Sequence, residues 1–377
     1  MWLRNKKVGL GVFPLLVWSG VARADYALNM TPGVTPLSHD IYDLHMLILW
    51  ICTAIAAIVF GVMFWSILKY RKSQGAVAAQ FHHSTKAEMV WTIIPILILI
   101  GMAVPATKTL IKMEQVGDAD MTIKVTGYQW KWRYDYVDSG VGFFSTLAAD
   151  SNEIRQKGSG KDPASADHYL LNVDNPMVVP VGKKLRILTT ANDVIHAWWV
   201  PALGWKRDAI PGFINESWAL IEKPGIYRGQ CAELCGQDHG FMPIVVKAVP
   251  EDEYDTWLGD MLVAQSDSNA GADREWTMDE LMEKGGQVYG TFCVACHQPN
   301  GQGVPPAFPA LAGSAIATGP IEGHMDRVMH GKAGTAMAAF AGQLSDVEIA
   351  AVITYERNSF GNKTGDVVQP ATIKAAR

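Results

Sequence analysis

The sequence predicts a multidomain membrane protein with a two-helix transmembrane hairpin, an all-β sandwich and an all-α C-terminal domain. Its 377 residues exceed one ordinary domain. Only 18% of the residues are charged and 49% are hydrophobic, which favours membrane segments. The net charge of −5 argues against nucleic acid as a partner, because proteins that bind it present a basic face.

The first 24 residues are typical of a secretory signal peptide. A basic start precedes a short apolar core at 8–21, and Ala22 and Ala24 frame a small-residue cleavage site. The alternative is an uncleaved first transmembrane helix, but this core is too short to span a bilayer well. No cysteine follows the cleavage site, so a lipid anchor is not supported.

Two long apolar runs, at about 44–68 and 89–110, follow within residues 25–115. Each run can cross a hydrocarbon core of about 30 Å at about 1.5 Å per residue. The segment between them carries three lysines and one arginine, and positive charge keeps such a loop in the cytoplasm. The hairpin therefore leaves both ends of the mature chain outside the cytoplasm.

Residues 116–262 change to the pattern of short strands. The segments 121–126, 184–190 and 243–249 are rich in β-branched residues, and glycine and proline lie between them. This pattern is typical of a sandwich or a barrel. Residues 138–167, rich in glycine, serine and aspartate, predict a long inserted loop.

Helical signals dominate residues 276–365, after a linker predicted at 263–275 and before a tail at 366–377. Thr277 and Ser345 are each followed three residues later by glutamate. Both patterns are capping boxes, which start helices. The C-terminal part is therefore expected to be all-α.

The sequence Cys293-Val-Ala-Cys296-His297 is the attachment pattern of c-type haem. Two thiols add to the haem vinyl groups, and the adjacent imidazole is placed to bind the iron. A redox pair or a disulfide is the alternative interpretation. We expect the carbonyl of Pro305 or Pro306 to pair with His297.

The sixth iron ligand is expected in a loop before the last helix, where Met337 lies. Ligation by histidine and methionine raises the iron's reduction potential. The rival candidates in this region are Met325, Met329, His324 and His330. Met337 is preferred because it precedes the helix start at Ser345.

A second cysteine pair lies in Cys231-Ala-Glu-Leu-Cys235-Gly-Gln-Asp-His239-Gly-Phe-Met242. Thiolate and thioether are soft ligands and imidazole suits copper, so this set predicts a copper site. Two coppers could share the two sulfurs, with His196 as a remote second histidine. The alternative is a Cys231–Cys235 disulfide beside unrelated side chains.

Aromatic residues occupy every second position from Tyr128 to Tyr136. A period of two places all five on one face of a strand. Core packing explains most of them, and the lysine and arginine between them are expected on the opposite face.

At this point the sequence closely resembles subunit II of haem–copper cytochrome c oxidases that carry a fused C-terminal cytochrome c domain. The resemblance covers nearly all of the mature chain. Its motifs are Trp91-Thr-Ile-Ile-Pro95, Gly127-Tyr-Gln-Trp-Lys-Trp-Arg-Tyr-Asp-Tyr136, Val173-Asp-Asn175, Asp193-Val-Ile-His196, Asp208-Ala-Ile-Pro-Gly212 and the loop from Cys231 to Met242.

The resemblance implies a cupredoxin-like sandwich with a dinuclear copper A centre, and a class I cytochrome c domain. Cys231 and Cys235 would bridge the coppers, His196 and His239 would be the terminal imidazoles, and Met242 the weak thioether ligand. Glu233 would bind copper through its carbonyl and a magnesium or manganese ion, shared with subunit I, through its carboxylate.

Other residues receive roles through the same resemblance. Trp130 would be the point where electrons enter, and Glu88 the mouth of a proton channel. Asp174 and Asp193 match carboxylates that help dock a basic cytochrome c.

The expected function is electron transfer from a cytochrome c-type donor through haem c and copper A to subunit I. There oxygen is reduced to water with proton translocation, and subunit III is a further partner. The expected location is the bacterial inner membrane, with both cofactor domains on the periplasmic side. Two alternatives are a nitric or nitrous oxide reductase subunit and a non-catalytic copper carrier or assembly protein.

Overall fold

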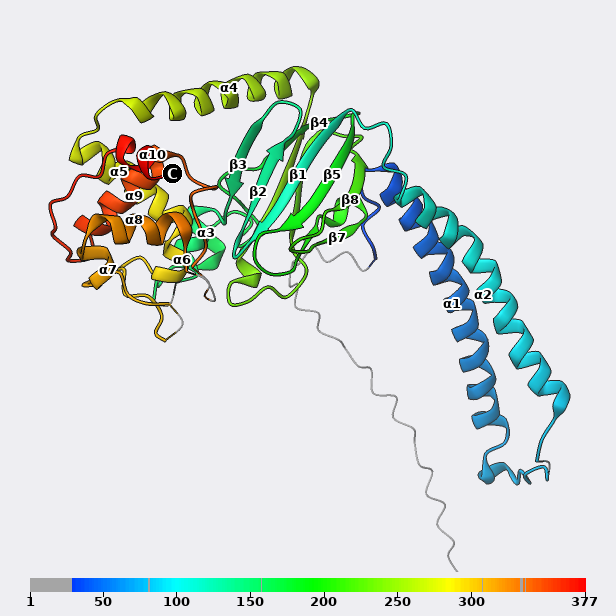
Figure 1. Ribbon diagram of the computed structural model, residues 1–377. Coiled ribbons are helices and arrows are strands. Elements are labelled where there is room, and N and C mark those ends of the chain that lie inside the picture. Colours follow the sequence, from blue (N-terminus) through cyan, green and yellow to red (C-terminus); the bar gives the residue numbers. More distant parts are fainter. Residues whose placement is uncertain (1–28, 81, 157, 307, 333–334, 336) are drawn as a thin grey trace, which may run out of the picture.

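The computed structural model describes residues 29–377 except 81, 157, 307, 333–334 and 336. The chain forms a long helical hairpin, a β-sandwich and a helical C-terminal domain, in that order (Figure 1). The sandwich lies between the other two parts. The predicted signal peptide lies outside the described residues.

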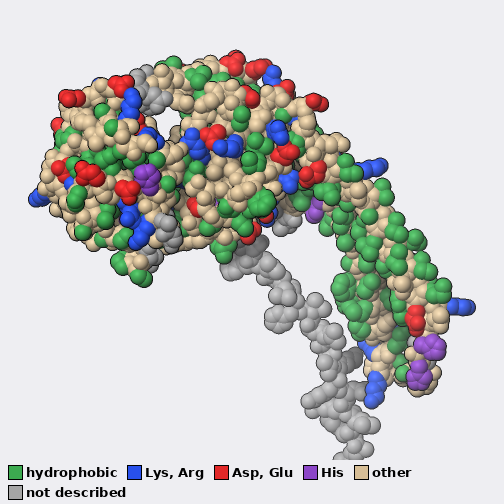
Figure 2. Space-filling view, in the orientation of Figure 1, with side chains coloured by type: hydrophobic (Ala, Val, Ile, Leu, Met, Phe, Trp, Pro, Cys, Tyr) green, Lys and Arg blue, Asp and Glu red, His purple; other side chains and the backbone are tan. Residues whose placement is uncertain are grey.

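The hairpin consists of α1 (Pro36–Lys69) and α2 (Thr85–Met113), joined through the short helix η1 (Lys72–Gln74). Both long helices are apolar enough to cross a membrane. No residue in the most apolar 18-residue stretch of either helix is buried. Figure 2 shows hydrophobic side chains along the hairpin. The helices are longer than predicted, because a capping box at Thr35 and a cap at Ser84 start them within polar sequence.

The sandwich is built from two five-stranded sheets, with strand orders β3-β2-β1-β5-β8 and β4-β10-β9-β6-β7. Parallel pairs β1–β5 and β4–β10 interrupt otherwise antiparallel pairing. All three predicted strands are present. The strands are β1 (Met121–Tyr128), β2 (Lys131–Tyr136), β3 (Val141–Ser145), β4 (Met177–Pro180), β5 (Lys184–Ala191), β6 (His196–Trp199), β7 (Lys206–Ala209), β8 (Asn215–Leu220), β9 (Gly225–Cys231) and β10 (Pro243–Val249).

The predicted single aromatic strand is wrong, because the chain reverses direction at Gln129 and Trp130. Tyr128 ends β1 and pairs with Lys131, the first residue of β2. Only the three aromatics on β2 lie in the core between the sheets, each at most 2% exposed: Trp132, Tyr134 and Tyr136.

The predicted long loop at 138–167 contains β3, the helix α3 (Ala149–Ile154) and the short helix η2 (Pro163–Ser165). The predicted linker is also more ordered than its composition suggested. Helix α4 (Glu251–Ala270) runs through most of it, and η5 (Gly271–Asp273) follows. Figure 1 shows α4 reaching from the sandwich to the C-terminal domain.

The C-terminal domain is helical, as predicted, and both capping boxes start helices there. Its core lies mainly between α5 and α9, with Ile349 and Ile353 fully buried. The predicted tail forms a last helix whose Ile373 joins this core. The helices are α5 (Met278–Phe292), α6 (Val294–His297), α7 (Ala315–Thr318), α8 (Ile321–His330), α9 (Asp346–Asn358) and α10 (Pro370–Ala376).

Candidate copper and haem sites

The predicted copper ligands come from three strand ends of one sheet and the loop between two of them. His196 begins β6 and Cys231 ends β9. Cys235 lies in the β9–β10 loop, His239 begins the short helix η4 (His239–Phe241), and Met242 directly precedes β10. Pairing of β9 with both β6 and β10 brings these positions together.

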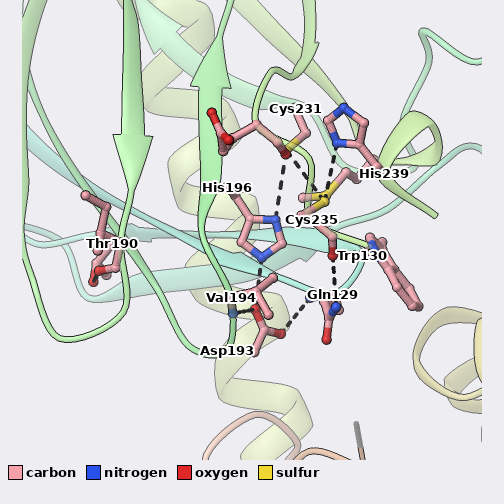
Figure 3. Close-up of polar contacts among 12 residues, drawn as sticks. Gln129, Trp130, Thr190, Asp193, Val194, His196, Cys231, Cys235 and His239 are labelled. Carbon is pink, nitrogen blue, oxygen red and sulfur yellow. Dashed lines mark hydrogen bonds and ion pairs between the residues drawn. The ribbon is translucent and has the colours of Figure 1, made fainter. Parts of the chain in front are cut away.

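The two cysteines and two histidines converge with their donor atoms close together (Figure 3), and Met242 joins them. The Sγ atoms of Cys231 and Cys235 are 3.8 Å apart. The Nδ1 atom of His196 lies 3.9 Å from the Sγ of Cys231, and that of His239 lies 3.4 Å from the Sγ of Cys235. The Sδ of Met242 lies 3.5 Å from the Sγ of Cys235.

This geometry fits a metal centre better than the alternative disulfide. A disulfide bond is about 2.05 Å long, and both cysteines are free thiols. Hydrogen bonding from Cys235 and then from His196 holds the pKa of Cys231 far below its ordinary value, whereas the neighbouring Cys231 and burial raise that of Cys235. The pair therefore loses one proton readily, and a bound cation would favour loss of the second.

A further donor is the backbone of the same loop. The carbonyl oxygen of Glu233 lies 3.4 Å from the Sγ of Cys231, so it can reach a metal held by the sulfurs. The Glu233 side chain is exposed, as is that of the next residue, Leu234, which is 78% exposed. The carboxylate is thus free to meet another subunit.

The Asp193 side chain fixes the orientation of His196. Asp193 Oδ1 lies 2.9 Å from the Nε2 of His196, which leaves the Nδ1 atom directed at the sulfur. The other oxygen of Asp193 accepts the backbone N–H of Gln129 at 2.7 Å. This partly buried carboxylate–imidazole pair is typical of metal ligands. The sequence suggested only a docking role for Asp193 and did not predict its contact with His196.

Trp130 lies directly against the copper loop (Figure 3). Its indole N–H donates to the carbonyl oxygen of Cys235 at 3.2 Å, and the Gln129 amide donates to the same oxygen at 2.9 Å. The predicted electron entrance is therefore joined to a cysteine of the site by one hydrogen bond.

The haem-attachment residues lie where α5 meets α6. Cys293 caps α5, and Cys296 and His297 belong to α6. Burial raises the pKa of both thiols, that of Cys296 to about 11, so these cysteines stay protonated, unlike Cys231. The two cysteine pairs are therefore chemically distinct.

The predicted partner of His297 is wrong. Its Nδ1 atom pairs with the carbonyl oxygen of Pro309 at 2.9 Å, and not with Pro305 or Pro306. The bridge between Val304 and Phe308 folds the loop so that the later proline faces the imidazole. The Nε2 atom of His297 is left free to bind iron.

Met337 lies in the loop before α9 and packs against the same hydrophobic cluster as Cys293. Met325 and Met329 on α8 are buried in that same cluster. His324 pairs with Glu356 at 2.8 Å. The remaining rival, His330, is exposed and pairs with Asp326 at 3.0 Å.

Two predicted residues lie apart from both sites. Glu88 is exposed in the first turn of α2 at the sequence-predicted cytoplasmic end. Asp174 accepts hydrogen bonds from the backbone and hydroxyl of Thr146, and burial raises its pKa. The Asp174 carboxylate therefore has a structural role within the sandwich.

Three family descriptions match the chain. "Cytochrome C oxidase subunit II, periplasmic domain" matches residues 121–249. "Cytochrome C oxidase subunit II, transmembrane domain" matches residues 23–109. "Cytochrome C oxidase, cbb3-type, subunit III" matches residues 280–355.

Individual relatives agree. The chain is 40% identical over 235 residues to the probable cytochrome c oxidase subunit 2 of Rickettsia bellii, covering 62% of this chain and 83% of that protein. It is 38% identical over 236 residues to cytochrome c oxidase subunit 2 of Cereibacter sphaeroides, covering 60% of this chain and 78% of that protein. A crystal structure also matches, that of the periplasmic domain of subunit II of cytochrome oxidase from Bradyrhizobium japonicum. The two sequences are 44% identical, and the match covers 40% of this chain and 99% of that chain with a TM-score of 0.35.

The fold and the two sites define a membrane-anchored electron-transfer protein with a cupredoxin-like and a cytochrome c domain. The chain belongs to the cytochrome c oxidase subunit II family. It is thus a subunit of an oxidoreductase complex, which implies a haem–copper subunit I in a membrane. Its two extramembrane domains imply copper A and haem c.

Proposed function

We propose that this chain takes electrons from a cytochrome c-type donor at haem c and passes them through copper A to a haem of subunit I. Oxygen is reduced to water there, and the reaction is coupled to proton translocation. The observation that carries the proposal is the convergence of two thiols, two imidazoles and a thioether within 3.4–3.9 Å on a domain fused to a haem-attachment motif.

Five side chains would hold the copper: Cys231, Cys235, His196, His239 and Met242. Sharing one electron over two metals keeps the reorganisation on electron transfer small. The Glu233 carbonyl completes the site.

The exposed carboxylate of Glu233 is the proposed ligand of a magnesium or manganese ion at the contact with subunit I. Its exposure beside a buried metal site supports this role. Oxygen ligands are those that both ions prefer.

In the cytochrome domain, Cys293 and Cys296 hold the haem covalently. His297 and Met337 would supply the two protein ligands of its iron. The Pro309 carbonyl supports the assignment of His297, because it fixes the imidazole in the orientation a ligand needs. Trp130 is the proposed electron entrance of the copper domain.

The hairpin anchors the chain in the bacterial inner membrane, next to subunits I and III. Both cofactor domains then lie on the periplasmic side, and Glu88 lies at the cytoplasmic mouth of a proton channel. The proposed divisions are a signal peptide (1–24), the hairpin part (25–115), the copper domain (116–262), a linker (263–275), the cytochrome domain (276–365) and a tail (366–377).

Optical spectroscopy of the purified oxidase tests this function. We expect a c-type haem band and a near-infrared band from mixed-valence copper. Cys231→Ser should abolish the copper band and oxygen uptake with the donor while it leaves the haem c band intact. Cys52→Ser, a matched change at an exposed cysteine on α1, should alter neither. Absence of both bands from the native protein would refute the proposal.

A further inference from the structure

A lysine lies buried between the copper domain and the cytochrome domain. Lys131 begins β2 and is only 6% exposed. Its Nζ atom lies 4.0 Å from the ring centre of Phe292, 4.9 Å from that of Phe144 and 5.2 Å from that of Phe340. Among the described residues it has no hydrogen-bond or ion-pair partner, so aromatic faces are its main close contacts.

The three rings come from both domains. Phe144 lies on β3 of the sandwich, whereas Phe292 ends α5 and Phe340 lies in the loop before α9. Phe144 and Phe292 meet edge to face at 5.1 Å between ring centres, and Phe292 and Phe340 do so at 6.3 Å. Such contacts are favourable geometries for aromatic rings and for a cation. We call these four residues the lysine clamp.

The clamp lies at the haem site. Phe292 directly precedes Cys293, the first attachment cysteine, and Phe340 follows the proposed iron ligand Met337 by three residues. Phe292 and Cys293 both pack against the hydrophobic cluster that contains Phe340. The clamp therefore joins the two segments of the cytochrome domain that flank the haem.

The clamp also adjoins the copper site. Lys131 follows Trp130, whose indole donates to the carbonyl oxygen of Cys235. The path from Lys131 to the predicted copper ligand Cys235 thus consists of one peptide bond, the Trp130 side chain and one hydrogen bond.

A cleft of about 350 Å³ lies beside the clamp. Phe144 and Phe292 line it together with polar side chains from both domains, among them Arg133, Asp174 and Lys284. The clamp rings are therefore part of a larger contact between the two domains.

On the basis of the function proposed above, we propose that the start of β2 is the docking face for the chain's own cytochrome domain. Lys131 is the positioning residue that seats Phe292 and Phe340, and with them the haem, against Trp130. Electrons cross from the haem site to the copper site through this contact.

Time-resolved electron transfer in the full oxidase tests the docking face. A photoexcited dye reduces haem c, and the near-infrared band reports the arrival of the electron at copper A. In Lys131→Glu a buried carboxylate would face the negative ring faces, so we expect the transfer rate to fall by about tenfold or more. Phe144→Ala removes one ring of the clamp and should also slow transfer.

The matched control is Lys184→Glu, because Lys184 also lies over an aromatic ring, at 5.0 Å from Trp218, but outside the domain contact. It should keep the native rate. Wild-type rates in both Lys131→Glu and Phe144→Ala would overturn the docking face. If Lys131→Glu fails to assemble, Phe144→Ala decides. Failure of the native protein itself to pass electrons from haem c to copper A would instead refute the proposed function.

Discussion

Gly127 and His196 are in such close contact that no side chain fits between them. A Cβ atom on Gly127 would lie 2.7 Å from the Cδ2 of His196 and 2.9 Å from its Cγ. The imidazole cannot yield freely, because Asp193 holds its other side. The absence of a side chain at Gly127 therefore sets the position of a copper ligand.

Replacing this glycine should damage the copper site. We expect Gly127→Ala to displace His196, weaken the near-infrared band and destabilise the copper domain by about 1–3 kcal/mol. Copper content and thermal unfolding would measure both effects. Gly117→Ala is the control, because an added Cβ there meets nothing within 4 Å. Native copper content in Gly127→Ala would contradict this account.

Asp193 orients His196, so its charge should matter for copper retention. We expect Asp193→Asn to lower copper affinity by about 10- to 100-fold, since partners of metal-bound histidines have effects of this size. Competition with a copper chelator measures the affinity. Asp138→Asn removes a carboxylate that only caps the strand backbone at Thr122, and should have no effect. Equal copper loss from the two variants would count against the role of Asp193.

Met337 should set the reduction potential of haem c. We expect Met337→Leu to lower this potential by on the order of 0.1 V, because thioether ligation favours the reduced iron. A redox titration of the haem band measures it. Met329→Leu, a buried change on α8, should leave the potential unchanged. A lowered potential in Met329→Leu, together with an unchanged potential in Met337→Leu, would assign the iron ligand to Met329.

The lysine clamp should make electron transfer depend on pH. Burial lowers the pKa of Lys131 to about 7, whereas the charge of the nearby Asp193 opposes this shift. A separated domain exposes the lysine, whose pKa then returns to about 10.4. Docking therefore releases a proton between these values and becomes more favourable as the pH rises through about 7 to 10.

The measurable result is an intramolecular transfer rate that increases with pH above about 7 and levels off below it. Lys131→Met removes the titrating group and should give a flatter profile. Identical profiles for the native protein and Lys131→Met would show that another group controls the step.

Local sequence signals predicted most of the fold. The capping boxes at Thr277 and Ser345 start helices because each reciprocal bond forms within four residues. The strands at β1, β5 and β10 follow from their β-branched residues. Four copper ligands lie in one short loop, so only His196 had to be brought from elsewhere.

Features that depend on contacts between distant segments were missed. Alternation placed Lys131 on the face opposite the aromatics, but it gave no sign that the cytochrome domain covers this residue. The pairing of His297 with Pro309 depends on the path of a proline-rich loop, which spacing does not reveal. The turn at Gln129 lacks the usual glycine or asparagine signal, so the aromatic run resembled one strand.

Helix α4 has a consequence for the kinetics of the assembled oxidase. Its 20 residues span about 30 Å as a semi-rigid rod between the two cofactor domains. A tether of this kind holds its partner at an effective concentration on the order of millimolar. The step from haem c to copper A should then be first-order, with little sensitivity to salt or dilution, while capture of the external donor alone retains the dependence on ionic strength.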